Sequence, residues 1–148
     1  MKELIDTIDL NEIQEYIEKK ENVKLILKKT IQNECKRGGH KPHHDTGDNN
    51  HMLYTRYSAS SLLSKDYTGG QFVFLDEDNN EIESYDQSTH FNKTLIFDVS
   101  WKHMVKPHTN GKRVVNLYFW TTDPETPLPD NVQRYIKSNK FHLKTSKT

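Results

Sequence analysis

The sequence has 148 residues, of which 21 are Lys or Arg, 21 are Asp or Glu and only 32% are hydrophobic. That length fits one domain, and the balanced charge excludes a net field that would draw the chain to nucleic acid or to a membrane. No apolar run approaches the roughly 20 residues of a membrane helix, and the acidic N-terminal segment is not a secretory signal. The single cysteine, Cys35, excludes an internal disulfide framework and suits a reducing compartment. We therefore expect a single domain over 1–148, cytoplasmic or otherwise intracellular.

The first predicted element is an amphipathic helix over 9–20, where apolar residues recur at helical spacing behind Asp9 as the N-cap. Apolar residues then alternate at the start of 22–34, which predicts a strand. The two glycines and the proline of 35–42 predict a loop that leads to a histidine pair.

Short strands and polar turns alternate over the rest of the core. The Asn110-Gly111 pair is a strong hairpin signal, and short strands at regular spacing favour an all-β sandwich over a βαβ sheet. The expected strands cover 53–63, 71–75, 81–86, 93–98, 102–106 and 112–121. The sequence thus predicts an all-β jelly-roll sandwich with an N-terminal helix, core strands over 22–121 and a C-terminal tail over 122–148 with a short helix at 131–137.

Two histidines and one carboxylate are spaced as metal ligands. His43 and Asp45 are two residues apart, and on an extended segment side chains at i and i+2 project from the same face. His44 then points the other way. His103 follows 60 residues after His43, which is enough chain for several strands to wrap a sandwich between them. The set is the facial triad of non-haem iron oxygenases, which leaves three coordination positions open; zinc also accepts such ligands, but no HExxH-type helix is present.

Arg113 is the candidate anion ligand of the same site. It lies ten residues after His103, and the intervening turn folds its strand back toward the metal cavity. A guanidinium offers a planar bidentate fork that suits a terminal carboxylate, such as the distal end of 2-oxoglutarate.

These motifs together resemble the prolyl-hydroxylase branch of the iron(II)/2-oxoglutarate oxygenases. The carrying segments are HHD, YTRYSASSLLSKDYTGGQFVF and HMVKPHTNGKRVVNLYFWTTDP. They are most similar to the catalytic domain of the leprecan-type prolyl 3-hydroxylases. The resemblance covers roughly residues 40–124 and implies a double-stranded β-helix fold.

The resemblance also implies the cofactors and the residues that hold them. It implies Fe(2+), 2-oxoglutarate as cosubstrate and O2, with ascorbate as a further candidate. The metal positions fall on His43, Asp45 and His103, the carboxylate position on Arg113, and a position packed against the cosubstrate on Val105. The family's cosubstrate tyrosine is replaced by Leu62, and Tyr57 or Tyr54 is expected to compensate.

For the substrate, the resemblance favours a prolyl residue in a protein or peptide. A free amino acid or another small molecule is the alternative, because a fold does not determine a substrate. A non-catalytic jelly-roll binding module is a second alternative. We further expect His40, Lys41 and Arg56 to be candidates for a substrate groove. The expected surface histidines are His51, His90, His108 and His142.

Overall fold

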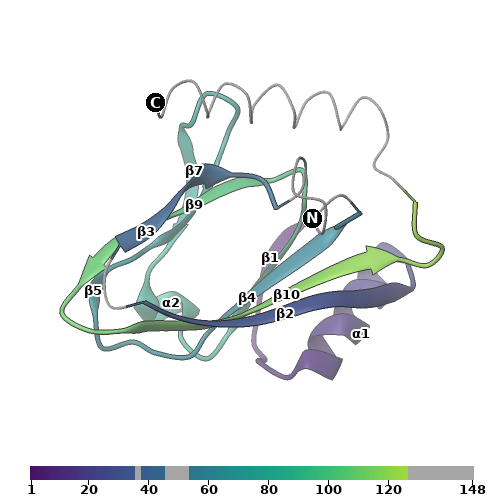
Figure 1. The fold of residues 1–148 in the computed structure, drawn as a ribbon, viewed down its shortest axis with the longest axis horizontal. Coiled ribbons are helices and arrows are strands. Elements are labelled where there is room, and N and C mark those ends of the chain that lie inside the picture. The colour runs from purple at the N-terminus through teal and green to yellow at the C-terminus, as the bar shows by residue number, and fades with distance from the viewer. Residues whose placement is uncertain (36–37, 46–53, 127–148) are drawn as a thin grey trace.

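The alternating apolar positions assemble two antiparallel β-sheets that face each other as a sandwich (Figure 1). The computed structural model describes residues 1–35, 38–45 and 54–126. Its strands are β1 (Lys2–Ile5), β2 (Leu25–Cys35), β3 (Gly38–His43), β4 (Tyr57–Leu62), β5 (Thr68–Gly69), β6 (Phe72–Leu75), β7 (Glu81–Tyr85), β8 (Thr94–Asp98), β9 (Lys102–Thr109) and β10 (Arg113–Thr122). The first sheet has the order β1-β8-β4-β10-β2; the second has β3-β9-β6-β7, with β5 paired to β9. The predicted all-β class and jelly-roll core are confirmed.

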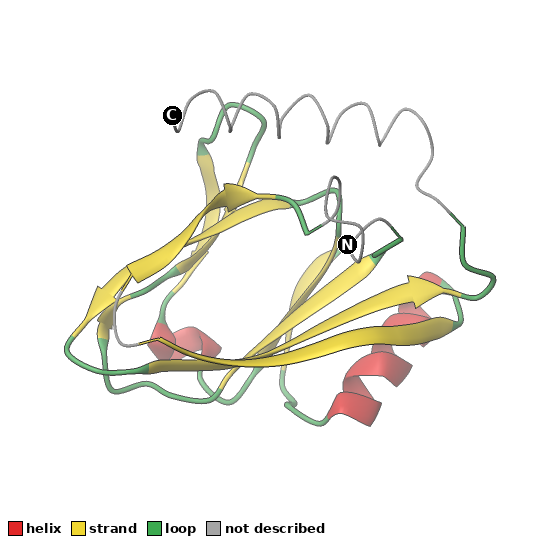
Figure 2. Ribbon diagram, viewed as in Figure 1, coloured by secondary structure: helices red, strands yellow, loops and turns green. Residues whose placement is uncertain are grey.

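The predicted N-terminal helix is α1 (Leu10–Glu21), and it covers the outer face of the first sheet (Figure 2). The Asp9 side chain accepts a hydrogen bond from the backbone N–H of Glu12, which satisfies one free donor of the first turn. Ile13 and Ile17 are fully buried and pack against the sheet. This contact anchors the helix, since burying one such side chain contributes about 1.5–3 kcal/mol.

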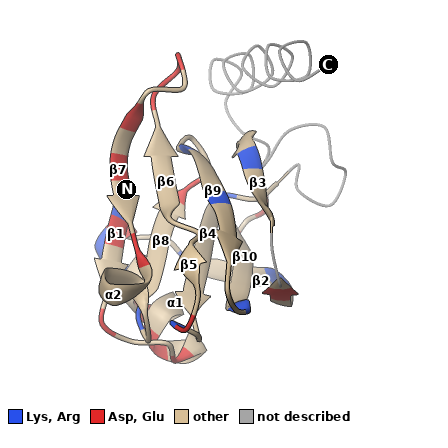
Figure 3. Cartoon of the chain, turned by 90° about the vertical axis from the view of Figure 1, so that its left-hand side faces the viewer, with Lys and Arg blue, Asp and Glu red and all other residues tan. Residues whose placement is uncertain are grey.

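The inner faces of the two sheets enclose the aromatic core. One cluster joins Phe72, Phe74 and Phe97 with Leu95 and Val105, all of them less than a tenth exposed. The second sheet ends at β7, an edge strand that carries the acidic residues Glu81 and Glu83 (Figure 3). Charges on an edge strand discourage pairing with another chain.

Several segments depart from the sequence prediction. The predicted loop over 35–42 contains β3, whose glycines and proline are tolerated because β3 is an edge strand with an irregular register. β1 was not predicted, because four residues carry too little periodicity and the strand is held by pairing with β8. β9 runs on to Thr109, beyond the predicted end at 106.

The chain between the predicted strands 81–86 and 93–98 forms a short helix, α2 (Gln87–His90), which the sequence did not predict. Asp86 caps it by accepting a hydrogen bond from the backbone N–H of Thr89. The predicted helix at 131–137 lies outside the described residues. Within the described part of the chain, no helix has the length and apolar character needed to cross a membrane.

Candidate metal centre

Folding brings His43, Asp45 and His103 together from two distant stretches of chain. His43 ends β3 and lies directly opposite His103 in the register of β3 with β9. The Oδ1 atom of Asp45 lies 3.3 Å from Nε2 of His43 and 3.2 Å from Nε2 of His103. One ligand atom from each residue lies within 4.8 Å of the other two. The three donors therefore surround a space that suits a single small ion.

In both histidines Nδ1 faces a backbone carbonyl oxygen, and Nε2 faces the space between the three donors. Nδ1 of His43 lies 2.6 Å from the carbonyl oxygen of Lys41, and Nδ1 of His103 lies 3.3 Å from that of Trp101. A carbonyl oxygen only accepts, so each Nδ1 carries the proton in the neutral ring. The lone pair of each Nε2 is then available to a metal, which is the usual arrangement of histidine ligands.

Asp45 supplies the negative charge of the centre. Burial alone would raise the pKa of its carboxyl group, but the charge and hydrogen bonds of His103 and His43, when these imidazoles are protonated, hold that pKa well below its usual value. The side chain of His103 is 5% exposed and that of Asp45 12%, whereas that of His43 is 37% exposed. The centre is therefore reached from the side of His43.

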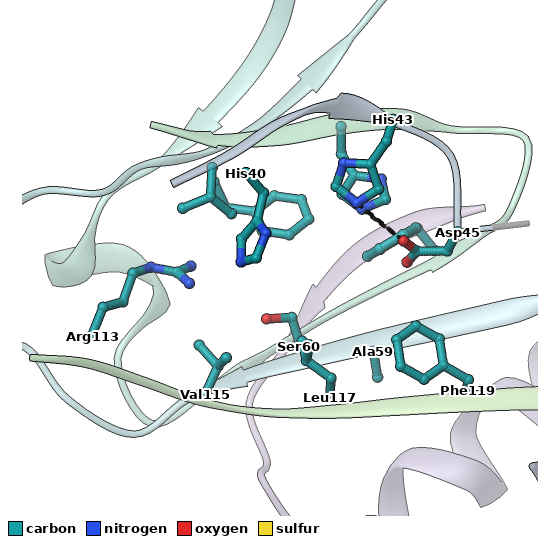
Figure 4. A pocket seen from close by; sticks show the side chains of 13 residues that line it. His40, His43, Asp45, Ala59, Ser60, Arg113, Val115, Leu117 and Phe119 are labelled. Carbon is teal, nitrogen blue, oxygen red and sulfur yellow. Dashed lines mark ion pairs between the residues drawn. The ribbon is translucent and has the colours of Figure 1, made fainter. Parts of the chain in front are cut away.

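A cavity extends from the three donors to Arg113, which enters it from the start of β10 (Figure 4). Arg113 is only 6% exposed, and its Nε donates to the carbonyl oxygen of Gly70 at 3.1 Å. Its Nη2 is buried and finds no hydrogen-bond partner among the residues that the structure describes. Among the described residues, no carboxylate forms an ion pair with this guanidinium. A buried unpaired cation is costly, so this end of the cavity favours an anion.

The wall between the two ends is mostly apolar. His40 points into the cavity between Arg113 and the metal donors, and Ser60 faces it from β4 (Figure 4). Burial lowers the pKa of His40, and the positive charge of Arg113 and of any protonated neighbouring histidine lowers it further. The remaining lining residues are Ala59, Phe72, Phe97, Val105, Val115, Leu117 and Phe119.

The structure separates the residues expected to contact the cosubstrate. Val105 lines the cavity. Tyr57 lies on the opposite face of the first sheet, in the cluster beneath α1, and its hydroxyl donates to Glu21 at 3.2 Å. Tyr54 is half-buried and does not line the cavity, and Leu62 is buried against Tyr67. Strand alternation turns Tyr57 away, so the expectation that it replaces the missing tyrosine is wrong.

The other histidines divide in an unexpected way. His44 points away from the centre, as expected, with Nδ1 3.1 Å from the carbonyl oxygen of Val99. The surface placement of His90 and His108 is wrong, since both are at most 2% exposed. The ring of His108 lies between the carbonyl oxygens of Cys35 and Gly38. The sequence does not predict this contact, because the partners are about 70 residues away along the chain. His51 and His142 lie outside the described residues.

Of the expected groove residues, only His40 lines the cavity. Arg56 donates through Nη2 to the backbone and hydroxyl oxygens of Thr126, and Lys41 is exposed on β3. Tyr67, which the sequence did not single out, lies beside Gly70 and interacts with Arg113. Its position beside the Gly69-Gly70 pair was the available signal.

Solved structures with this fold include several oxygenases. A prolyl-4-hydroxylase from Pseudomonas putida superposes with a TM-score of 0.57 at 14% identity, covering 81% of this chain and 70% of its own. A prolyl hydroxylase from Trichoplax adhaerens, in complex with a hypoxia inducible factor peptide fragment, has a TM-score of 0.58 at 15% identity, covering 84% and 63%. An oxidoreductase of the 2OG-Fe(II) oxygenase family from Burkholderia pseudomallei has a TM-score of 0.57 at 16% identity, covering 67% and 46%.

At these identities the likeness shows the fold alone, and the chain spans between 46% and 70% of these three proteins. No curated protein sequence matches the chain. Residues 30–120, more than half of the chain, match the sequence profile of the 2OG-Fe(II) oxygenase superfamily. Oxygenases of this superfamily use Fe(2+), 2-oxoglutarate and O2, and the cavity offers a fitting donor set in His43, Asp45 and His103. The chain belongs to the 2OG-Fe(II) oxygenase superfamily.

Proposed function

We propose that this oxygenase hydroxylates an unactivated C–H bond of a prolyl residue in a protein or peptide. In this proposal His43, Asp45 and His103 hold ferrous iron, and Arg113 holds the distal carboxylate of 2-oxoglutarate. The observation that carries it is the shared cavity: three converging metal donors lie at one end and an unpaired buried guanidinium group at the other.

The donor set fits iron in both number and kind. Two neutral imidazoles and one carboxylate are the facial triad of non-haem iron sites, which leaves adjacent positions open for a chelating keto acid and dioxygen. When bound, iron would activate O2, which is the oxidant: one oxygen atom would go to 2-oxoglutarate, which leaves as succinate and carbon dioxide, and the other to the C–H bond of the substrate. The protein itself supplies positioning, and no acid–base pair among the described residues is needed.

Arg113 orients the cosubstrate along the cavity. A carboxylate bound at Nη2 would satisfy the buried donor and neutralise its charge. The apolar side chains of Val105, Val115 and Leu117 line the path between this carboxylate and the metal donors. They exclude water from the cosubstrate, which strengthens each electrostatic contact inside the cavity.

The substrate is proposed to approach from the exposed side of His43. This imidazole is the most solvent-accessible of the three donors, so a C–H bond can reach the metal there while the rest of the substrate stays outside the cavity. Two prolyl hydroxylases with this fold, one of them bound to a peptide, support a prolyl substrate. The 3-hydroxylase resemblance and the alternative of a small-molecule substrate are left to experiment.

The first test measures metal binding and succinate release together. The parent protein, loaded with Fe(II) and supplied with 2-oxoglutarate and ascorbate, should release succinate. His103→Ala should abolish both iron binding and succinate release. Lys41→Ala, which keeps the backbone carbonyl facing His43 and removes only an exposed side chain, is the matched control for iron binding. Succinate release that survives His103→Ala would overturn the ligand assignment.

The second test identifies the substrate class. The loaded protein is incubated with a library of proline-containing peptides, and the peptides are analysed by mass spectrometry for the gain of one oxygen atom. Fragmentation then locates the oxygen on C3 or C4 of the prolyl ring. Oxidation of free amino acids with no peptide modified would replace the prolyl-peptide proposal with its small-molecule alternative.

A further inference from the structure

The guanidinium of Arg113 has a second polar neighbour that the proposed function does not use, the phenol of Tyr67. Tyr67 lies just before β5 and is only 6% exposed. Its ring and the Arg113 side chain meet beside Gly70, and the interaction with the phenol opposes the lowering of the Arg113 pKa by burial. Burial raises the pKa of Tyr67, although Arg113 opposes that shift, so the phenol is neutral near pH 7. A neutral phenol oxygen can accept a hydrogen bond from the guanidinium.

The backbone around Tyr67 is built to let these two side chains meet. Gly70 has a φ of +69°, and a Cβ added there would lie 2.9 Å from Cε1 of Tyr67 and 3.3 Å from Cδ of Arg113. Gln87 fixes the backbone of Tyr67 by donating to its carbonyl oxygen at 2.5 Å. The tyrosine ring meets the buried imidazole of His108 edge-on, with 5.6 Å between ring centroids. The tyrosine is therefore held in one place against the arginine.

The contacts of the guanidinium divide into two groups. Its Nε donates to the carbonyl oxygen of Gly70, and the phenol of Tyr67 provides a further contact. Nη2 is the buried atom without a partner. Two fixed contacts determine the plane of a guanidinium, and the plane determines where the remaining N–H groups point. The unpaired nitrogen is therefore presented to the cavity in a defined direction.

We propose that Tyr67 is a positioning residue for the cosubstrate, acting through Arg113. The proposal rests on the proposed binding of 2-oxoglutarate by Arg113. Tyr67 fixes the guanidinium so that Nη2 meets the distal carboxylate, and it thereby favours dicarboxylic over monocarboxylic keto acids. Leu62, the residue at the position of the tyrosine in the resembled family, carries no hydroxyl, and Tyr67 provides one from a different segment of the chain.

The test compares two keto acids that differ in the distal carboxylate. Kd values for 2-oxoglutarate and 2-oxobutyrate are measured by calorimetry on the Mn(II)-loaded protein. Tyr67→Phe keeps the ring and removes the hydroxyl, so it should weaken 2-oxoglutarate binding about tenfold, in the range of a hydrogen bond to a charged group. Binding of 2-oxobutyrate, which cannot reach the arginine, should not change. Tyr118→Phe removes a hydroxyl from the opposite face of the first sheet and is the matched control.

The outcomes separate the two proposals. Weaker binding of 2-oxoglutarate alone in Tyr67→Phe supports the positioning role. An equal loss for both keto acids indicates a merely structural role and overturns it. If Arg113→Lys weakens 2-oxoglutarate binding and Tyr67→Phe does not, the positioning role is wrong while the proposed function stands. If the parent protein binds 2-oxoglutarate no better than 2-oxobutyrate, the role of Arg113 fails and that of Tyr67 fails with it.

Discussion

The imidazole of His103 lies parallel to the ring of Phe72, with 5.3 Å between the ring centroids and 6° between their planes. Phe97 contacts the same imidazole at a tilt of 59°, with 4.8 Å between centroids. Both phenylalanines are buried. The two rings restrict rotation of the imidazole. Together with the contact of Nδ1 to the carbonyl oxygen of Trp101, they keep Nε2 directed at Asp45.

Replacing Phe72 with leucine should therefore weaken metal binding without removing a ligand. We expect the affinity for Fe(II) to fall about tenfold, at the lower end of losses seen when groups that orient metal ligands are changed. Anaerobic titration with a competing chelator measures this. Phe74→Leu is the control for packing, since Phe74 is equally buried and its ring packs on Phe72, Phe97 and Trp101, whereas the rings that pack on His103 are those of Phe72 and Phe97. An equal loss in both variants would show that general core packing is responsible.

Metal should stabilise the fold through Asp45. A ligand that binds only the folded state adds about 2.7 kcal/mol when present at 100 times its Kd. Mn(II) should therefore raise the Tm of the parent protein in a thermal melt. Asp45→Asn removes the anionic donor and should abolish most of that rise, while the metal-free variant still folds. A variant whose Tm rises as much as that of the parent would place the metal elsewhere.

Gly70→Ala should affect both stability and cosubstrate binding. The added Cβ would lie 2.9 Å from Tyr67 and 3.0 Å from His108, at a positive φ. Gly38→Ala is a matched control, because Gly38 also has a positive φ but nothing lies within 4 Å of its Cβ position. Chemical denaturation should show a loss of about 1–2 kcal/mol from the left-handed backbone alone in Gly38→Ala, and a larger loss in Gly70→Ala.

The same pair of variants distinguishes strain from displacement. Only Gly70→Ala pushes directly on Tyr67 and Arg113, so only this variant should bind 2-oxoglutarate more weakly in the calorimetric assay. If Gly38→Ala weakens binding to the same extent, backbone strain and not the crowding of the arginine explains the effect.

Stability should depend on pH through His90. Burial lowers the pKa of His90 from 6.5 to about 4, although its hydrogen bond to the carbonyl oxygen of Ser60 opposes that shift. The unfolded chain therefore binds this proton more tightly than the folded protein does. The contribution of neutral His90 to the free energy of unfolding is complete above pH 6.5 and is lost as the pH falls toward 4. The loss is about 2–3 kcal/mol at pH 4.5.

Denaturation of the parent and of His90→Gln at pH 7 and pH 4.5 tests this contribution. Glutamine keeps an amide N–H for Ser60 but does not titrate, so the variant should lose less stability between the two pH values. Its loss at pH 7 reports packing alone. Identical pH dependence in the two proteins would mean that His90 does not contribute to acid denaturation.

The sequence alone predicts most strands and the proposed donor pair His43 and Asp45, because both follow from local patterns. The two-residue spacing of His43 and Asp45 is already set by an extended backbone. The sequence does not predict β3, because glycine and proline are poor strand formers. This strand depends on its pairing with β9. The burial of His108 likewise depends on carbonyl groups about 70 residues away.

The expectation that Tyr57 compensates for Leu62 was wrong for a second reason, the alternation of side chains along a strand. Tyr57 is near the metal segment in sequence, but one step along a strand places a side chain on the opposite face of the sheet. Tyr67 is further along the chain, at a position where no cosubstrate contact was expected, yet the glycine turn that follows it brings it beside Arg113. The periodicity of apolar residues does not predict contacts that depend on strand register or on turns.

Because His43 and His103 are opposite one another on β3 and β9, an ion held between them also joins an edge strand to the interior of its sheet. A shift of one residue between these strands would turn His43 to the other face and leave the ion with two donors. Metal binding and the correct register of β3 with β9 should therefore depend on each other. Loss of iron should loosen β3 first, together with His40, which faces the cosubstrate from the same strand.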